Sequence, residues 1–383
     1  MAAFDYQTLK KKYEDFTYPV IHVQISGKDF SENKAGLRIS DVEVEMTSGF
    51  EAAIATFWIY NCYNRGTAEF MFDDLKKYIV MGSAVAISMG YGVHVREIFR
   101  GFISRVNFVF RQEDIPGVEI TAMDVKGIMM AGSYSRQLKA DSFSEAVKEI
   151  LQKTAYTRLQ SGEVITGMDI TDTPDKNRSG GEKANDRTIE MVCESDYEFV
   201  VKAAKKYNYE FFSIGGTVYF RKAKSNTELL MEAAPGDGLR NYEISYDFTG
   251  IVEKVEVRGM DVGKSKTISA SKKMKNKLSQ GNKAKPLIKD SRKVYIDPTV
   301  TSKEEAEYRA GYLAEDISYR LGTLEAEFIG LPELTPGRFL KIRSLGKAVS
   351  NTFYLVTVRH IMDDRGYLTR VTGKTAGMET EGV

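Results

Sequence analysis

The stretch that decides the fold is GTLEAEFIGLPELTPGRFLKIRSLGKAVSNTFYLVTVRHIMDDRGYLTRVTG, residues 322–373. Apolar residues alternate with glutamates over 324–328, which is the period-two pattern of a half-buried strand. Turns rich in proline, glycine and aspartate separate it from three further runs with β character, at residues 338–343, 353–361 and 367–371. We therefore expect an antiparallel meander whose edges must be covered or closed.

Strand patterns also fill residues 19–125. Roughly seven short strands in this region predict a closed or nearly closed β barrel. Gly101 lies inside one of them, between Phe99 and Ile103, where a glycine allows a strongly bent strand to turn a barrel corner or forms an ordinary bulge.

The middle of the chain changes to helical period near residue 132. Ser142 with Glu145, and Ser195 with Glu198, have the spacing of capping boxes that begin helices. A hairpin follows over residues 209–220, with Gly215 and Gly216 as a tight turn. Residues 161–187 are polar and are expected to form a long loop.

These patterns predict a mainly β fold (β+α) in which two barrel domains flank a small α+β domain. The expected units are a first barrel with an N-terminal arm at 1–130, a helix and hairpin domain at 131–235, a second barrel at 236–375 and a tail at 376–383. The second barrel is expected to carry a basic insertion at 264–293 and a helix at 302–319.

Composition is that of an ordinary globular protein, with 42% hydrophobic and 28% charged residues. A net charge of +1 argues against attraction of the whole protein to DNA. Cys62 and Cys193 lie too far apart in sequence to imply a disulfide framework. The N-terminus lacks the apolar core of a signal peptide, and no apolar run approaches the length of a membrane span.

The order of residues in the deciding stretch resembles the end of the phage late control D and tail-hub family. The matching residues are Gly322, Gly330, Pro332, Leu334, Pro336, Gly337, Ile342, Tyr354, Val356, His360, Gly366, Tyr367 and Thr369. Residues 194–220, with the sequence ESDYEF before a helix and a Gly-Gly hairpin, are similar to the small helix and hairpin domain of the same family. The resemblance covers residues 19–373 and implies two tail-tube-like barrels.

The resemblance implies a structural hub or baseplate protein of a contractile phage tail or tail-like injection particle, without a fused spike. In this family three copies form a ring that joins a hexameric inner tube to a trimeric spike. The implied partners are further copies in a homotrimer, the inner tube protein, a separate spike protein and other baseplate proteins, with DNA or cargo in the lumen left open. We expect synthesis in the bacterial cytoplasm followed by incorporation into a virion tail or an extracellular or injected particle.

Alternative functions are a baseplate-carried cell-wall hydrolase and a stand-alone carbohydrate- or nucleic-acid-binding β barrel. The residues give no catalytic, cofactor or metal motif, so we expect no enzyme. His22, His94 and His360 fall in expected strands without metal-ligand spacing. Residues 259–265 resemble a phosphate-binding loop, but Arg258 stands where its first glycine belongs.

A basic run at 264–293 is the one candidate site that the sequence offers. It is either a solvated loop or a lumen-facing or interface loop that attracts an acidic partner or DNA. The candidate residues are Lys272, Lys273, Lys275, Lys277, Lys283 and Lys285.

Overall fold

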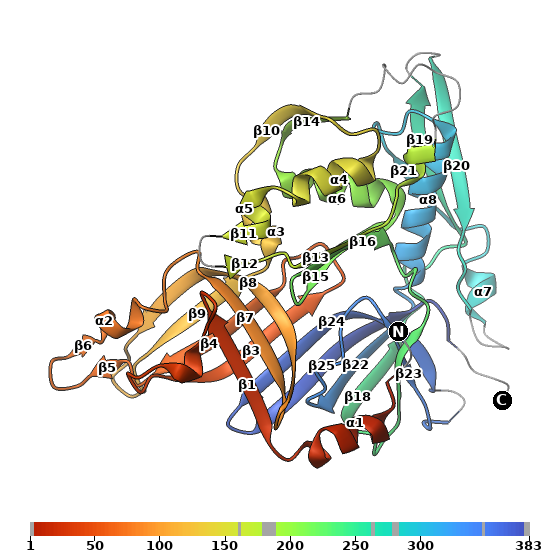
Figure 1. Cartoon of the computed structure of the whole chain (residues 1–383). Helices are drawn as coiled ribbons and strands as arrows, with labels where there is room; N and C mark the ends of the chain where they lie inside the picture. The colour runs from red at the N-terminus through yellow and green to blue at the C-terminus, as the bar shows by residue number, and fades with distance from the viewer. Residues whose placement is uncertain are drawn as a thin grey trace.

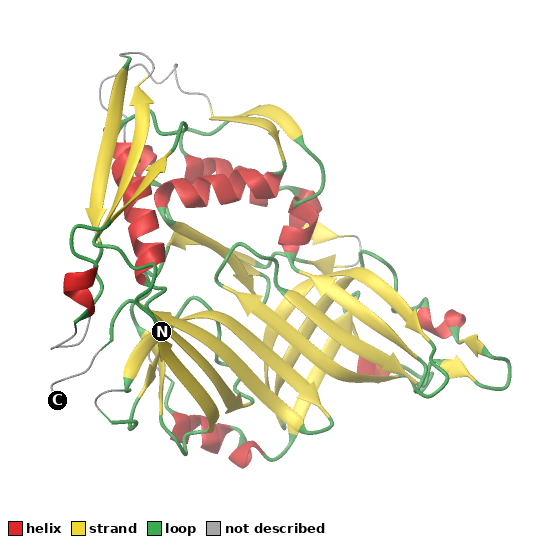
Figure 2. Ribbon diagram, turned by 180° about the vertical axis from the view of Figure 1, so that it is seen from behind, coloured by secondary structure: helices red, strands yellow, loops and turns green. Residues whose placement is uncertain are grey.

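The computed structural model describes residues 4–159, 162–177, 189–261, 265–277, 283–346 and 349–378. Figure 1 shows the N-terminal strands and the C-terminal strands side by side, with helices above them and a further layer of strands at one end of the molecule. Figure 2, seen from behind, shows the same division between a broad sheet and a helical layer. The expected mainly β fold with a small α+β region is confirmed.

One 13-stranded sheet contains most of the strands from both ends of the chain. Each strand in the following order pairs with the next: β18 (Leu239–Tyr246), β22 (Gly322–Ile329), β25 (Gly366–Thr375), β24 (Asn351–Asp363), β3 (Arg38–Thr47), β4 (Ile54–Tyr60), β9 (Gly117–Met123), β8 (His94–Val109), β7 (Ala84–Tyr91), β1 (Pro19–Ile25) and β2 (Lys28–Asp29). Off this path, β23 (Phe339–Ile342) pairs with β24 and with β17 (Leu229–Ala233).

The two expected barrels are joined through the pairing of β3 with β24, in which Val44 lies opposite His360. Among the described strands, this path does not return to its starting strand, so the pairing closes no barrel. The sheet instead curves over a single core. That core takes buried residues from both ends of the chain, such as Phe57 and Ile87 from the N-terminal strands and Phe328 and Phe353 from the C-terminal ones.

Residues 330–338 form a buried loop between β22 and β23. Loops normally run over the surface because buried backbone groups need partners. Residues of the predicted meander, in β24 and β25, supply hydrogen-bond partners for the backbone of this loop. Gly330 N donates to Tyr367 O, Leu331 N donates to the Thr369 hydroxyl, and Leu334 O accepts a hydrogen bond from His360 Nε2 at 3.1 Å. A Cβ on Gly330 would overlap the ring of Tyr367, so this position requires glycine.

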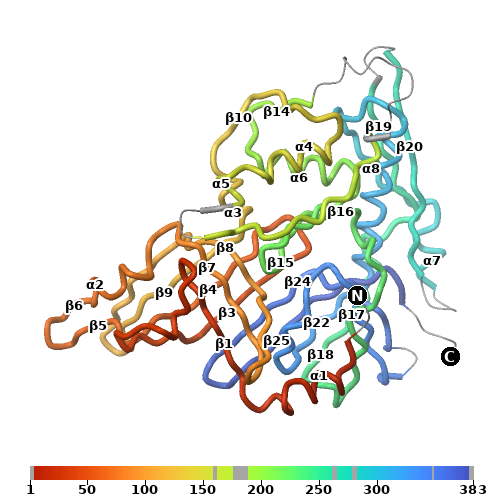
Figure 3. Tube along the Cα trace, viewed as in Figure 1, coloured from red at the N-terminus to blue at the C-terminus, as the bar shows by residue number. Residues whose placement is uncertain are grey.

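The N-terminal segment packs under the C-terminal strands. It contains α1 (Tyr6–Lys12) and η1 (Glu14–Phe16), and Phe4 N donates to Leu230 O of β17. Figure 3 shows the start of the chain beside β17. The Tyr13 hydroxyl donates to the buried Glu333 carboxylate at 2.6 Å, which ties this segment to the buried loop.

A small α+β region lies above the large sheet, with its own apolar core. Its elements are α3 (Val125–Met129), β10 (Tyr134–Leu138), α4 (Phe143–Leu151), α5 (Thr154–Thr157), β11 (Arg158–Leu159), β12 (Gly162–Glu163), β13 (Gly167–Ile170), η3 (Pro174–Asn177), β14 (Ile189–Glu194), α6 (Asp196–Tyr207), β15 (Tyr209–Ile214) and β16 (Thr217–Lys222). The capping box of Ser195 and Glu198 is confirmed. Gly215 and Gly216 both have positive φ, as the predicted turn requires. Part of the polar loop expected at 161–187 lies outside the described residues.

The described residues between 247 and 321 form an insert between two neighbouring strands, β18 and β22. The insert contains its own three-stranded sheet, in the order β20 (Lys266–Lys273), β19 (Lys254–Asp261) and β21 (Arg292–Ile296). It also contains α7 (Ala284–Leu287) and α8 (Lys303–Ser318), the helix predicted at 302–319. Helix α8 covers one face of this sheet through Ala306, Ala310 and Ala314, which pack near Val255 and Val257.

A projecting arm completes the fold at the far end of the N-terminal strands (Figure 1). It is built from β5 (Tyr63–Asn64), β6 (Glu69–Phe70) and α2 (Phe72–Leu75). A separate short helix, η2 (Phe30–Glu32), follows β2. The predicted domain boundaries stay a prediction.

Candidate assembly surfaces

A buried charged cluster fixes the small α+β region against the C-terminal strands. Arg221 Nε of β16 donates to Glu210 Oε1 of β15 at 2.7 Å, and Arg221 Nη2 donates to Gly337 O at 2.8 Å. The Tyr354 hydroxyl of β24 donates to the other oxygen of Glu210. Burial raises the pKa of the Glu210 carboxyl, and Arg221 opposes that shift. Because each partner is needed to compensate the others, the cluster holds the two regions in one arrangement.

A second joint connects the small region to the N-terminal strands. Lys126 is fully buried, and its Nζ donates to Glu51 O at 2.5 Å. Burial lowers the pKa of Lys126. The Ser213 hydroxyl of β15 donates to Asp124 Oδ2 at 2.6 Å. The N-terminal and the C-terminal strands of the large sheet are therefore both attached to the region of the hairpin β15–β16.

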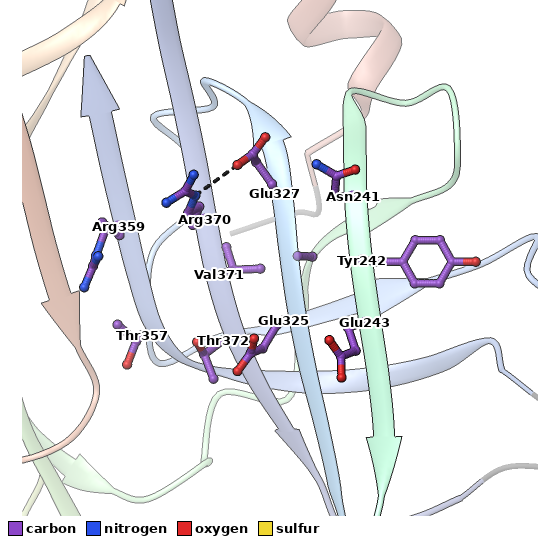
Figure 4. Close-up of a pocket in the computed structure, with 11 residues that line it drawn as sticks. Asn241, Tyr242, Glu243, Glu325, Glu327, Thr357, Arg359, Arg370, Val371 and Thr372 are labelled. Atoms are coloured by element: carbon purple, nitrogen blue, oxygen red, sulfur yellow. Dashed lines mark hydrogen bonds and ion pairs between the residues drawn. The ribbon is translucent and has the colours of Figure 1, made fainter. Parts of the chain in front are cut away.

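The outer face of the large sheet contains a shallow groove of about 600 Å³. Figure 4 shows its polar side chains in rows across neighbouring strands. Its lining is Asn241, Tyr242, Glu243, Glu325, Ala326, Glu327, Thr357, Arg359, Arg370, Val371 and Thr372. One row is compensated, because Arg370 pairs with Glu327 at 2.9 Å and Arg359 pairs with Glu45 of β3.

The neighbouring row of the groove holds two carboxylates directly opposite each other. Glu243 of β18 is the register partner of Glu325 of β22, and both are exposed. Figure 4 shows the two carboxylates on neighbouring strands. Among the described residues, neither forms an ion pair. Like charges placed opposite each other destabilise a sheet, so this acidic pair is a candidate contact for a positively charged partner.

The structure places the predicted lysines on the exposed surface of the insert. Lys272 and Lys273 end strand β20, whose outer edge pairs with no described strand. The other candidates lie beyond the strand, and Lys277 forms a bridge with Gly377 near the end of the chain. The basic run is thus part strand and part connection, rather than a single loop. Residues 264 and 278–282 of the run lie outside the described residues.

A row of three cations crosses the exposed face of the insert sheet. Lys254 of β19 is the register partner of Lys273 of β20 on one side and of Arg292 of β21 on the other. Val255 and Val257 are buried toward α8, so side chains of opposite parity, including Lys254, face away from the helix. Glu256 in the next row compensates part of this charge, because it pairs with Arg292 at 3.4 Å and with Arg258 at 2.7 Å.

Sequence reasoning found Lys273 but missed Lys254, Arg292, Glu243 and Glu325. Composition showed only the run of lysines, because a row across strands becomes visible once the register is known.

A third exposed surface is aromatic and lies on the projecting arm. Phe70 packs edge-on against Phe108 with ring centroids 5.1 Å apart, and Tyr63 packs against Phe110 at 5.4 Å. Phe110 is 59% exposed although it is apolar. Exposed apolar clusters of this kind are typical of contact surfaces.

The other motifs acquire structural roles. His360 is buried, whereas His22 of β1 pairs with Asp29 at 2.9 Å and His94 begins β8. Gly259 lies in the antiparallel pair β19–β20, which is not the strand-to-helix setting of a phosphate-binding loop, and residues 262–264 of that motif lie outside the described residues. Within the described part of the chain, no group of three potential metal ligands occurs. No helix in the same part is long and apolar enough to cross a membrane.

The fold is that of phage tail proteins. The structure matches the prophage MuSo2 43 kDa tail protein of Shewanella oneidensis with a TM-score of 0.64, over 93% of this chain and 98% of that chain, at 13% identity. A tail protein of Neisseria meningitidis matches with a TM-score of 0.63, over 95% and 98% of the two chains, at 11% identity. An Escherichia coli component of the type VI secretion system, described as structurally similar to the bacteriophage T4 tail proteins gp27 and gp5, gives 0.52 over 92% and 76%, at 10% identity.

A family model described as the Alg8 N-terminal domain matches residues 22–364, and the chain belongs to that family. The sequence resemblance named the late control D family, and the family model that matches is a different one. The tail-hub type of fold that the resemblance implies is confirmed. Comparison with curated protein sequences gives no match.

Proposed function

We propose that this protein is a structural, non-enzymatic hub of a contractile phage tail or tail-like injection particle, related to the late control D proteins. In this proposal three copies form a ring that joins a hexameric inner tube to a trimeric spike carried on a separate chain. The observation that carries the proposal is the likeness to the Shewanella tail protein over nearly the whole length of both chains.

The joined sheet supports this role physically. A ring of three copies presents six similar positions only if each copy offers two similar halves in a fixed relation. The pairing of β3 with β24 and the shared core provide a fixed relation between the N-terminal and C-terminal strands. The buried clusters around Glu210 and Lys126 further restrict movement between regions.

The proposed partners are two further copies, the inner tube protein, the spike protein and other baseplate proteins. A chain of the PdpA-VgrG complex of Francisella matches with a TM-score of 0.52, and this likeness supports a place beside a spike protein. The mature location would be an assembled tail or particle.

The test is a native pull-down of the tagged chain from its producing cells, followed by negative-stain microscopy and mass spectrometry. We expect tail-like particles that contain tube, sheath and spike proteins. An untagged culture is the matched control. Recovery of the chain alone, from cells that do assemble such particles, would contradict the proposal.

A further inference from the structure

We propose that neighbouring copies of this chain contact each other through the cationic row Lys254, Lys273 and Arg292 of one copy and the acidic pair Glu243 and Glu325 of the next. This inference rests on the proposed function, because it assumes that copies assemble. It names the charged surfaces that would hold one copy against another.

The first argument is that each surface is unfavourable in an isolated copy. Lys254 has a cation directly opposite it on both neighbouring strands, and Glu243 has a carboxylate opposite it on β22. Cross-strand pairs of like charge destabilise a sheet, whereas pairs of opposite charge stabilise it. Docking one row against the other converts repulsive neighbours into attractive ones.

The second argument is exposure. The insert sheet is covered on one face by α8, while its other face carries the cationic row and, further along the strands, Ile296 at 83% exposure and Met260 at 52%. Glu243 of the acidic pair lies on β18, the last strand of the large sheet, and Glu325 lies on β22, the one described strand with which β18 pairs. Both surfaces are therefore open to a partner.

The third argument is charge complementarity within one chain of nearly zero net charge. The net charge is +1, yet the cationic row, which Glu256 compensates only in part, lies on the insert and the acidic pair lies on the large sheet. Two different surfaces that complement each other form a head-to-tail contact, which closes into a ring when the rotation between copies allows it. A second copy is thus the occupant that the observations favour over nucleic acid.

The experiment compares charge-reversal variants of the full chain by analytical ultracentrifugation. An acidic reversal carries Glu243→Lys and Glu325→Lys, and a basic reversal carries Lys254→Glu and Lys273→Glu. We expect each reversal to weaken self-association at least tenfold, because like charges then face each other across the contact. A variant that carries all four substitutions should recover wild-type association.

The matched control reverses Lys34 and Lys139, which are exposed and lie outside both surfaces. Circular dichroism melting checks that every variant folds. A zero-length carbodiimide cross-link between isotopically light and heavy copies gives the second readout. We expect it to join a peptide with Glu243 or Glu325 from one copy to a peptide with Lys254 or Lys273 from the other.

Several results would overturn the inference. One is that the wild-type chain stays monomeric at high concentration. Another is that the reversals leave the self-association constant within twofold of the wild-type value. A third is that the basic reversal abolishes binding of a fluorescent DNA duplex without affecting self-association. The pull-down separates this failure from that of the proposed function. Normal particles assembled from a basic-reversal variant would refute the contact and leave the hub role intact.

Discussion

The large sheet and the sheet of the insert each have one buried face, but different kinds of side chain cover that face. The large sheet curves over a core that includes Phe57, Phe328 and Phe353, and aromatic side chains of this size bury about 150–250 Å² each. The insert is covered by one helix that packs through alanines against Val257. The comparison indicates that the large sheet supplies the stability of the protein, whereas the insert mainly displays a charged and partly apolar face.

The largest expected effect comes from Phe353→Ala in β24. Removing this fully buried ring should lower the free energy of unfolding by about 3–5 kcal/mol. Because β24 shares a core with the N-terminal strands, the fluorescence of Trp58, the only tryptophan, should report the same shift in a urea titration. Thr352→Ala on the same strand is the control. An unchanged Trp58 transition would mean that the N-terminal and C-terminal strands of the sheet unfold separately.

A substitution in the buried charged cluster around Glu210 should destabilise the protein nearly as much as Phe353→Ala. Arg221→Met leaves a buried carboxylate without its cation, so we expect a loss of about 3 kcal/mol or more in chemical denaturation. The double variant Glu210→Gln with Arg221→Met should lose less than the single variant, because no charge is then buried. Equal losses would show that packing rather than charge governs this joint.

The buried loop should make the large sheet sensitive to acid. Burial lowers the pKa of His360 to about 4, whereas an unfolded histidine titrates near 6.5. Between these values the unfolded chain binds a proton that the folded chain does not. The free energy of unfolding should therefore fall as the pH drops from about 6.5, by about 3 kcal/mol at pH 4.

His360→Gln should reduce this pH dependence, although it destabilises the protein at pH 7. The measurement is a set of urea titrations of both proteins between pH 4 and 7. Parallel pH profiles for the two proteins would remove His360 as the cause.

A smaller and more local effect is expected in the insert. Ile317→Val removes one buried methyl group of α8 and should cost about 1 kcal/mol. Hydrogen exchange should quicken in β19 and β20 and stay unchanged in β24 and β25. Faster exchange in all four strands would show that the insert and the large sheet open together.

The smallest effect should come from the outer face of the large sheet. Arg370→Ala removes a half-exposed ion pair with Glu327, and such pairs contribute about 0–1 kcal/mol. Thermal unfolding at low and high salt measures it. A loss of stability well above this range would indicate that Arg370 and Glu327 form a coupled network with Arg359.

Local features of the fold were predictable because they depend on a few adjacent residues. The Gly215–Gly216 turn, the cap at Ser195 and the alternation over 324–328 follow from backbone conformation and side-chain period. The prolines and glycines of 330–337 indicate turns. The burial of that loop was not predicted, because it depends on hydrogen bonds from His360 and Thr369 further along the chain.

The sequence by itself determined the β-rich class, the helix at 302–319, the hairpin of the small region and the presence of a basic run. Only the tertiary structure decided that β3 pairs with β24, so that two expected barrels share one open sheet. It also decided which charges lie opposite each other, at Glu243 and Glu325 and at Lys254 and Lys273. The physical reason is that strand pairing joins residues far apart in the chain, and a shift of one residue in register would place every side chain on the other face.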